Sequence, residues 1–179
     1  MLQITIPAAE HYDERTNRFI KTKEQTLQLE HSLVSLSKWE SKWCKPFLGK
    51  NKMTRAETID YIRCMTLTQN VDPKVYLSLT NENVDAVREY IESPMTATTI
   101  NEGKTGGGRE IITAEIIYYW MVAFNIPFEC QKWHLNRLLT LIRVCDIKNR
   151  PNKKMNKKDL MSRNRALNEA RKKSLNTKG

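Results

Sequence analysis

The sequence lacks any apolar run long enough to cross a bilayer. The longest run, AEIIYYWMVAF at residues 114–124, is about half of the ~20 residues that a spanning helix needs. The opening residues, MLQITIPAAE, also lack the basic segment and apolar stretch of a secretory signal. We therefore expect a protein that is not secreted and has no membrane partner.

Cysteine is scarce and widely spaced. The four cysteines, at positions 44, 64, 130 and 145, form no CxxC pair, which predicts reduced thiols in an intracellular protein. Cys130 and His134 lie four residues apart on a predicted helix and could share a metal ion. Two ligands do not make a site, so we favour a core thiol and expect neither a metal nor another cofactor.

A recognisable set of catalytic groups is also missing. The three histidines, His11, His31 and His134, have no serine or cysteine beside them in a nucleophile-elbow setting. The carboxylates alternate with basic residues, as they do on solvated helix faces. Because no acid, base and nucleophile converge, the chain is not expected to be an enzyme.

Glycine is rare outside one loop. INEGKTGGGRE, residues 100–110, holds four of the six glycines. Its Gly-Lys-Thr resembles part of a phosphate-binding loop, but the glycine required five positions earlier is Thr98. Three glycines also follow where a helix should begin. The segment therefore predicts a flexible loop rather than a nucleotide site.

Net charge is absent from most of the chain. Residues 1–141 hold 17 basic and 17 acidic residues, whereas residues 142–179 hold 13 basic and 3 acidic residues and carry the whole net charge of +10. This asymmetry predicts a neutral globular domain, residues 1–148, and a basic helical or partly disordered extension, residues 149–179.

The apolar patterns predict a mainly α fold with a small β-hairpin or meander at its N-terminus. LQITIP alternates apolar and polar residues, and RFIKTKEQTLQLEH resumes a period of two. The period then becomes helical, with Leu33, Leu36, Trp39 and Trp43 on one stripe. Ser37 and Glu40 could form a capping box for this helix, which Pro46 ends.

Further helices follow along the chain. Thr54 with Glu57, and Asp72 with Pro73, are start signals for the next two. NENVDAVREYIES predicts another short helix. Residues 114–124 are apolar nearly all round, which predicts a helix in the middle of the core. A single helix is expected over residues 128–147, and a last basic helix from Lys157 to about Leu175.

Two groups of residues are candidates for partner binding. The first is the aromatic pair Trp39 and Trp43, for which core packing is the competing interpretation. The second is the basic set on the last predicted helix: Arg163, Arg165, Arg171, Lys172 and Lys173. These side chains could contact phosphates or an acidic protein, and charge alone does not choose between the two. No aromatic residue is interleaved with them, so no base stacking is expected.

Four stretches together resemble small proteins from the tail-gene region of tailed bacteriophages, usually identified as tail assembly chaperones. The stretches are TLQLEHSLVSLSKWESKW, TIDYIRCMTLTQNVDP, REIITAEIIYYWMVAFNIPFECQKWHLNRLLTLIRVCDIKN and SRNRALNEARKK. The resemblance covers most of the chain from about Leu27 onward. It brings no catalytic motif.

The resemblance implies a non-enzymatic, mainly helical protein that acts in the host cell cytoplasm during infection. Its partner would be the tape-measure protein, a long helical chain that such chaperones keep soluble during tail morphogenesis. Self-association is a second expected interaction. Two alternatives remain open: a structural neck or tail-completion protein of the virion, and a nucleic-acid-binding accessory protein that uses the basic C-terminal tail.

Overall fold

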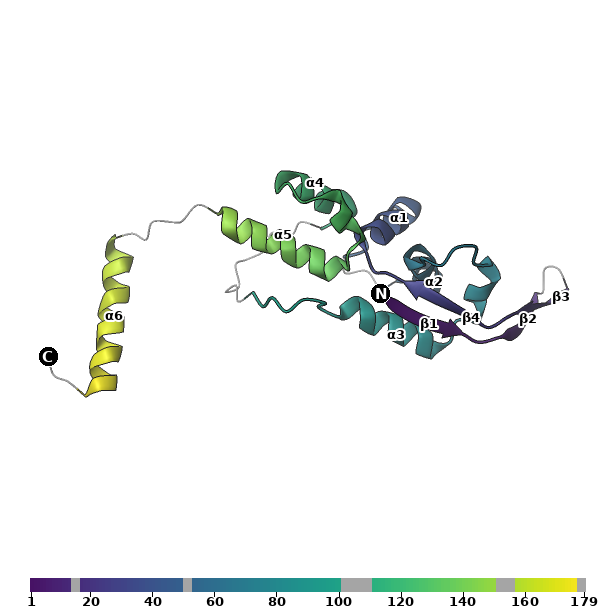
Figure 1. The fold of residues 1–179 in the computed structure, drawn as a ribbon, viewed down its shortest axis with the longest axis horizontal. Helices are drawn as coiled ribbons and strands as arrows, with labels where there is room; N and C mark the ends of the chain where they lie inside the picture. Colours follow the sequence, from purple (N-terminus) through teal and green to yellow (C-terminus); the bar gives the residue numbers. More distant parts are fainter. Residues whose placement is uncertain (14–16, 50–52, 101–110, 151–156, 177–179) are drawn as a thin grey trace. The chain divides into compact units, whose positions relative to one another are not determined.

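The computed structural model describes residues 1–13, 17–49, 53–100, 111–150 and 157–176. The chain forms two compact units, Met1–Ile147 and Lys148–Gly179, which are described separately (Figure 1). The first unit is mainly α-helical with a small β element at its N-terminus, as the sequence predicts. Residues 101–110 of the predicted glycine loop lie outside the described residues.

The N-terminal β element is a two-part antiparallel ribbon. β1 (Leu2–Ile6) pairs with β4 (Gln25–Leu29), and β2 (Ala9–Asp13) pairs with β3 (Arg18–Thr22). The two parts share one pairing register: Ile6 faces Gln25 and, three residues further along each strand, Ala9 faces Thr22. The interruption falls at Pro7, which has no backbone N–H for the ladder. The predicted hairpin is therefore confirmed, with its break at the proline.

The strand alternation places one face of β1 and β4 in the first core. Ile4, Ile6, Leu27 and Leu29 are buried, whereas the residues between them point to solvent. α2 (Arg55–Met65) and α3 (Asn81–Glu92), with the short 3-10 helix η1 (Pro73–Ser78), complete this core. Its largest buried members from these elements are Tyr61, Ile62, Met65, Tyr76 and Tyr90.

The start signals of these elements are mostly as predicted. Thr54 and Glu57 form a reciprocal capping box for α2. The Asp72 side chain accepts a hydrogen bond from the backbone N–H of Lys74, and Pro73 opens η1. Thr80 with Asn83 forms a further capping box at α3. In each case a short polar side chain satisfies a backbone N–H that has no helical partner.

The capping box predicted at Ser37 and Glu40 is wrong. α1 spans Leu33–Trp43, and its capping box is formed by Ser32 and Ser35. The backbone of Ser32 is extended, as an N-cap residue requires, whereas Ser37 lies inside the helix. The helix ends at Cys44, whose backbone is left-handed with φ 51°.

The second core of the first unit contains α1, α4 (Ala114–Ala123), the 3-10 helix η2 (Phe128–Lys132) and α5 (Leu135–Asn149). The single helix predicted over residues 128–147 is therefore wrong. The chain is extended at Trp133, and His134 forms a β-bridge with Ser32. The backbone N–H of Leu135 donates to the carbonyl oxygen of His31 at 2.7 Å, so this tertiary contact replaces a helical hydrogen bond.

In the second unit, α6 spans Lys157–Leu175. All its described side chains, from Met161 onward, are exposed. Unlike α1 to α5, this helix therefore buries no described side chain within its own unit.

Candidate protein-binding surface on α4 and α5

α4 lies at the surface of the second core, which corrects the expectation that it is buried in the middle. Only three of its side chains are buried, those of Ala114, Ile117 and Met121. Tyr119 is 68% exposed and Val122 is 59% exposed. A ten-residue helix with tyrosines at 118 and 119 and tryptophan at 120 has aromatic side chains spread over most of its circumference, so one packed side cannot bury them all.

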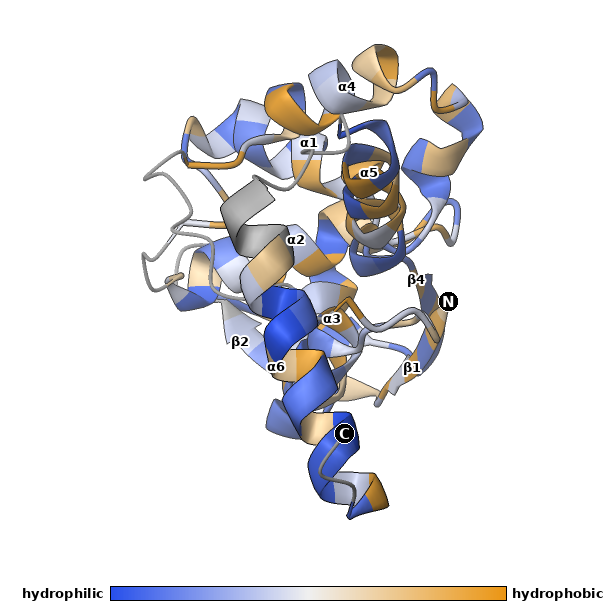
Figure 2. Ribbon diagram, turned by 90° about the vertical axis from the view of Figure 1, so that its left-hand side faces the viewer, coloured by the Kyte–Doolittle hydropathy of each residue, from blue (hydrophilic) through white to orange (hydrophobic). Residues whose placement is uncertain are grey.

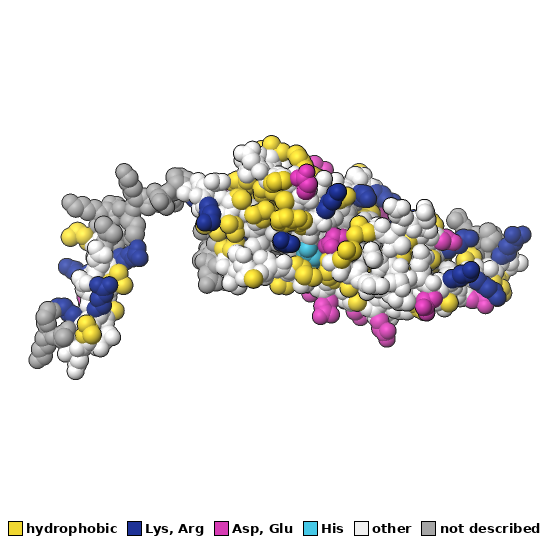
Figure 3. Space-filling view, in the orientation of Figure 1, with side chains coloured by type: hydrophobic (Ala, Val, Ile, Leu, Met, Phe, Trp, Pro, Cys, Tyr) yellow, Lys and Arg dark blue, Asp and Glu magenta, His cyan; other side chains and the backbone are white. Residues whose placement is uncertain are grey.

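Apolar side chains gather over α4 and α5 on one face of the first unit (Figure 3). Hydrophobic residues, coloured orange, occur along both helices in the second view (Figure 2). Along this part of the chain, from Ile111 to the end of α5, the exposed large apolar side chains are those of Ile111, Tyr119, Val122, Phe128 and Ile147. Scattered single apolar residues are ordinary on a protein surface, whereas a contiguous group is typical of a protein-binding site. We call this region the α4–α5 surface.

A groove of about 310 Å³ lies between α4 and α5, and its lining residues differ from the five exposed side chains just named. Five apolar or aromatic side chains and two charged ones line it: Ile112, Trp120, Phe124, Leu139, Ile142, Arg143 and Asp146. A floor of apolar side chains with a few charges at its edge is the arrangement that receives the apolar side of a helix. Because Arg143 and Asp146 carry opposite charges, the lining of the groove has no net charge.

The aromatic side chains beside this groove are held in place by polar contacts. The Tyr118 hydroxyl donates to Oε1 of Gln131 at 2.9 Å, which joins α4 to η2. The guanidinium of Arg137 lies over the ring of Trp133, 4.3 Å from its centroid. Burial raises the pKa of the Tyr118 hydroxyl, so this group remains a donor at neutral pH. These contacts join α4 to η2 and place a guanidinium on the ring of Trp133.

Glu40 fixes the start of α4. Its Oε2 accepts a hydrogen bond from the backbone N–H of Ala114 at 2.7 Å, and its Oε1 accepts one from the backbone N–H of Phe47 at 2.7 Å. Thr113, the N-cap residue of α4, makes no side-chain capping bond. A buried carboxylate from α1 therefore replaces the missing cap and opposes the positive end of the helix dipole.

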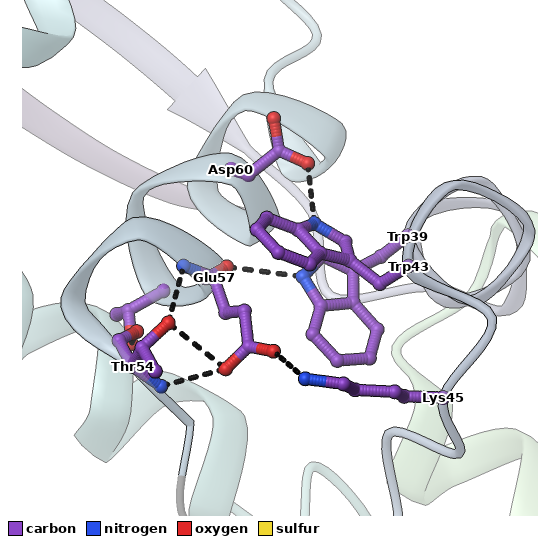
Figure 4. A network of polar contacts seen from close by, with 7 residues as sticks. Trp39, Trp43, Lys45, Thr54, Glu57 and Asp60 are labelled. Atoms are coloured by element: carbon purple, nitrogen blue, oxygen red, sulfur yellow. Dashed lines mark hydrogen bonds and ion pairs between the residues drawn. The ribbon is translucent and has the colours of Figure 1, made fainter.

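The tryptophan pair lies elsewhere, between α1 and α2 (Figure 4). Trp39 is 2% exposed, and its indole N–H donates to the backbone oxygen of Glu57 at 3.0 Å. Trp43 is half-buried, and its indole N–H donates to Oδ2 of Asp60 at 2.9 Å. Trp39 therefore belongs to the core and presents no surface to a partner, while Trp43 keeps part of its ring exposed.

The carboxylates of this α1–α2 network are held ionised by their donors. The Lys45 ammonium, at 2.6 Å, and then the backbone N–H and hydroxyl of Thr54 lower the pKa of Glu57 to about 2. Burial acts to raise the pKa of Asp60, but hydrogen bonds from Lys42 and Trp43 hold it below its ordinary value. The network joins two helices and the loop between them, which is a structural role.

The three histidines are engaged in structural hydrogen bonds. His11 Nε2 lies 2.8 Å from the Ser78 hydroxyl. His134 Nε2 lies 3.0 Å from the Tyr90 carbonyl oxygen, to which it donates, and its Nδ1 accepts from the backbone N–H of Asn136. His31 Nδ1 lies 2.5 Å from the Tyr61 hydroxyl oxygen. Within the described part of the chain, no group of three histidines, cysteines or acids could hold a metal ion.

The predicted basic set lies on α6, in the second unit. Arg163, Arg165, Arg171, Lys172 and Lys173 are exposed. The spacing of these residues distributes them around the helix rather than along one side. The structure places them on one element of the second unit, whereas the tryptophan pair belongs to the first unit.

The α4–α5 surface is the candidate site that the sequence reasoning missed. The sequence did contain an indication of this surface. The helix of residues 114–123 has more large apolar side chains than one packed side can bury, so some of them must be exposed. Within the described residues, no helix combines the length and apolarity needed to cross a bilayer. Comparison of the chain with protein-family models, curated proteins and solved structures finds no match.

Proposed function

We propose that this chain is a tail assembly chaperone of a tailed bacteriophage: a non-enzymatic factor that binds the tape-measure protein during tail morphogenesis in the host cytoplasm. The resemblance of four sequence stretches, from about Leu27 onward, is the first support. The observation that carries the proposal is the apolar character of α4 and α5: a groove of about 310 Å³ lies between the two helices, and Tyr119 and Val122 are exposed on α4.

The chemistry of this surface suits a helical client. A tape-measure chain that awaits its tube exposes apolar helix faces, which the groove side chains and the exposed apolar side chains of α4 can cover. Burial of apolar area would supply the affinity, at roughly 25 cal/mol per Å² before the costs of association. Because the groove is small, the contact would be weak and reversible, as release of the client requires.

Two hydrogen bonds hold α4, which carries part of this surface, against its neighbours. The buried Glu40 carboxylate fixes the start of α4, and Tyr118 fixes its outer side against η2. A preformed surface loses little conformational freedom when a partner binds. Most of the conformational entropy lost on binding would then be lost by the client rather than by the chaperone.

A second candidate function is nucleic-acid binding by the basic extension. The observation that favours it is the exposure of Arg165, Arg171, Lys172 and Lys173 on a helix that buries none of its described side chains. Such binding would weaken steeply with salt, because each phosphate contact releases counterions. Client binding through the α4–α5 surface would depend much less on salt. Titrations at two salt concentrations therefore distinguish the two functions.

Quantitative mass spectrometry of infected-cell lysate and of purified virions tests the proposal. An assembly chaperone should be abundant in lysate and absent from mature particles, and tape-measure peptides should accompany it in a pull-down. A constant copy number in purified virions would contradict the chaperone function. That result would instead support a structural protein of the neck or tail.

A further inference from the structure

A cleft with a positively charged lining lies between α1, α2 and η1, all in the first unit. It has a volume of about 390 Å³ and shares no lining residue with the groove between α4 and α5. The charged side chains of its lining are those of Lys38, Lys42, Asp60 and Arg63. Three cations and one acid give the lining a net charge of +2.

Helix spacing brings these charges to one place. Lys38 and Lys42 are four residues apart on α1, so they lie on one side of that helix. Asp60 and Arg63 are three residues apart on α2 and also share a side. The ammonium of Lys42 pairs with Oδ1 of Asp60, and Oδ2 accepts the indole N–H of Trp43 (Figure 4). Both oxygens of the one acid are therefore bound within the protein.

The other two cations keep donors for a ligand. Lys38 makes no ion pair with any residue that the structure describes. Nη1 of Arg63 lies 3.9 Å from Oδ1 of Asp60, which is too far for a hydrogen bond. The Arg63 guanidinium lies over the ring of Tyr76, 5.5 Å from its centroid, and this contact uses none of its N–H groups.

The half-buried thiol of Cys64, also in the lining, lies where the positive charges meet. Burial, and then the charge of Asp60, raise the pKa of this thiol, whereas the charges of Lys42, Lys38 and Arg63 act to lower it. Three cations act on one side chain only if all of them lie close to it. The cleft therefore concentrates positive charge at one partly buried position.

We propose that this cleft binds the phosphate group of a small phosphate monoester. Such a group carries a charge of about −1.5 to −2 at neutral pH, close to the opposite of the charge of the lining, whereas a carboxylate carries a single charge. Arg63 can donate two parallel hydrogen bonds to phosphate oxygens, and Lys38 supplies a point charge. The Thr68 hydroxyl, which accepts a backbone N–H from β4 at 2.9 Å, lies in the lining and can donate its own proton.

The arrangement suits one compact anion better than a nucleic-acid strand. A strand presents a row of phosphates and is bound by cations spread along its path, often with aromatic side chains for the bases. Here the cations meet in one cleft, and the only aromatic side chain of the lining, that of Tyr76, is 5% exposed. The site does not involve the α4–α5 surface, so the inference is independent of the proposed function.

Protection of Cys64 from alkylation is the first test, because this thiol lies in the cleft. The full-length chain is treated with iodoacetamide in inorganic phosphate or in sodium chloride of equal ionic strength, at about pH 8, where phosphate has lost its second proton. Peptide mapping by mass spectrometry gives the rate at each cysteine. In about 10 mM phosphate the rate at Cys64 should fall about threefold or more, as for a dissociation constant of about 5 mM or less. The rate at Cys145, a thiol of intermediate exposure on α5, should not change.

Phenyl phosphate, a small monoester, should protect Cys64 as well as inorganic phosphate does. Both anions should also raise the urea midpoint of the chain, because they bind the folded state. This second measurement does not depend on the reactivity of the thiol.

A double variant makes the test specific. Lys38→Gln with Arg63→Gln removes two cations and leaves the pair of Lys42 with Asp60. The dissociation constant for phosphate should rise about tenfold or more, because charge-assisted hydrogen bonds are lost. Each variant is compared with itself without phosphate, since loss of the cations also changes the pKa of the thiol. Circular dichroism confirms that the variants are folded.

The matched control removes two cations outside the cleft. Lys23 and Lys132 are exposed and do not line it, so Lys23→Gln with Lys132→Gln should keep full protection. Equal slowing at Cys64 and Cys145, no slowing together with an unchanged urea midpoint, or full protection in the cleft variant overturns the proposal. A short oligonucleotide that protects Cys64 where phosphate and phenyl phosphate do not also overturns it, and would assign the cleft to nucleic acid.

Discussion

The Glu40 carboxylate of α1 caps the first turn of α4 through the backbone N–H of Ala114, 74 residues further along the chain, at 2.7 Å. The same carboxylate accepts a hydrogen bond from the backbone N–H of Phe47. One buried side chain thus holds α1, the loop that follows it and the helix that carries the proposed binding surface.

Replacing Glu40 by alanine should lower the free energy of unfolding by about 1–3 kcal/mol, because two backbone N–H groups lose their acceptor. Glu40→Gln should lose less, since the amide oxygen can still accept one of the two bonds. Glu115→Ala, at an exposed position of α4, should change stability by less than about 0.5 kcal/mol. Urea unfolding measures all three, and a Glu40→Ala chain as stable as the control would contradict the capping role.

The buried histidine pair should make stability depend on pH. His31 is 1% exposed and His134 is 6% exposed, and their ring centroids are 5.1 Å apart. Burial, and then the charge of His134, lower the pKa of His31 to about 3. Burial also lowers the pKa of His134. Both rings are therefore neutral in the folded chain near neutral pH.

An unfolded histidine has a pKa of about 6.5, so below that pH the unfolded chain binds a proton that the folded chain excludes. The stability is fully present above pH 6.5 and declines as the pH falls towards 3. For His31 alone, the loss between pH 7.5 and pH 5.0 should be about 2 kcal/mol. This window lies above the ordinary pKa values of Glu57 and Asp60.

Urea unfolding at these two pH values checks this prediction. A His31→Gln variant should lose most of the pH dependence, whatever its stability at pH 7.5. His11→Gln should retain it, because the His11 ring is only half-buried and lies beside Ser78. A wild-type chain equally stable at both pH values would refute the assignment of neutral buried rings.

The capping box of α2 should be worth about 1 kcal/mol, the usual cost of replacing an N-cap threonine by alanine. In Thr54→Ala, the backbone N–H of Glu57 loses its 3.3 Å contact with the threonine hydroxyl. Thr58→Ala is the matched control one turn later, where alanine improves helix propensity and should be neutral or slightly stabilising. Equal effects of the two substitutions on urea unfolding would argue against the cap.

The two tryptophans should differ in their contribution to stability. Trp39→Phe removes buried volume and leaves the Glu57 carbonyl without its indole donor, which should cost about 2–3 kcal/mol. Trp43→Phe should cost less than about 1.5 kcal/mol, because the ring is partly exposed and Lys42 still pairs with Asp60. The difference in urea midpoint between the two variants is the measured quantity. A larger cost at Trp43 would contradict the burial described here.

The sequence correctly predicted those elements that are determined by interactions between residues close together in the chain. The alternation in β1 and β4, the Thr54 and Glu57 box and the Asp72–Pro73 start depend on residues a few positions apart. The break between η2 and α5 does not. It depends on His31 and Ser32, about 100 residues earlier, which bind the backbone at His134 and Leu135.

The candidate surface was missed for a related reason. An all-round apolar helix predicts burial, but burial also requires neighbours on every side, and α4 packs mainly through Ala114, Ile117 and Met121. The partner of the buried Glu40 could not be predicted from the sequence either. The donor is the backbone N–H of Ala114, and every residue except proline has such a group. The exposed basic residues of α6, in contrast, follow directly from composition.

The most direct test of the account is the affinity of the full-length chain for the tape-measure protein, measured by titration calorimetry with wild type and with Tyr119→Lys, Val122→Lys. Both positions are exposed on α4, so the substitutions should change stability by less than about 0.5 kcal/mol. We expect a loss of affinity of about tenfold or more in the double variant. Glu24→Lys, on the N-terminal ribbon, should bind as the wild type does. Undiminished binding by the α4 double variant would contradict the proposal that this surface holds the client.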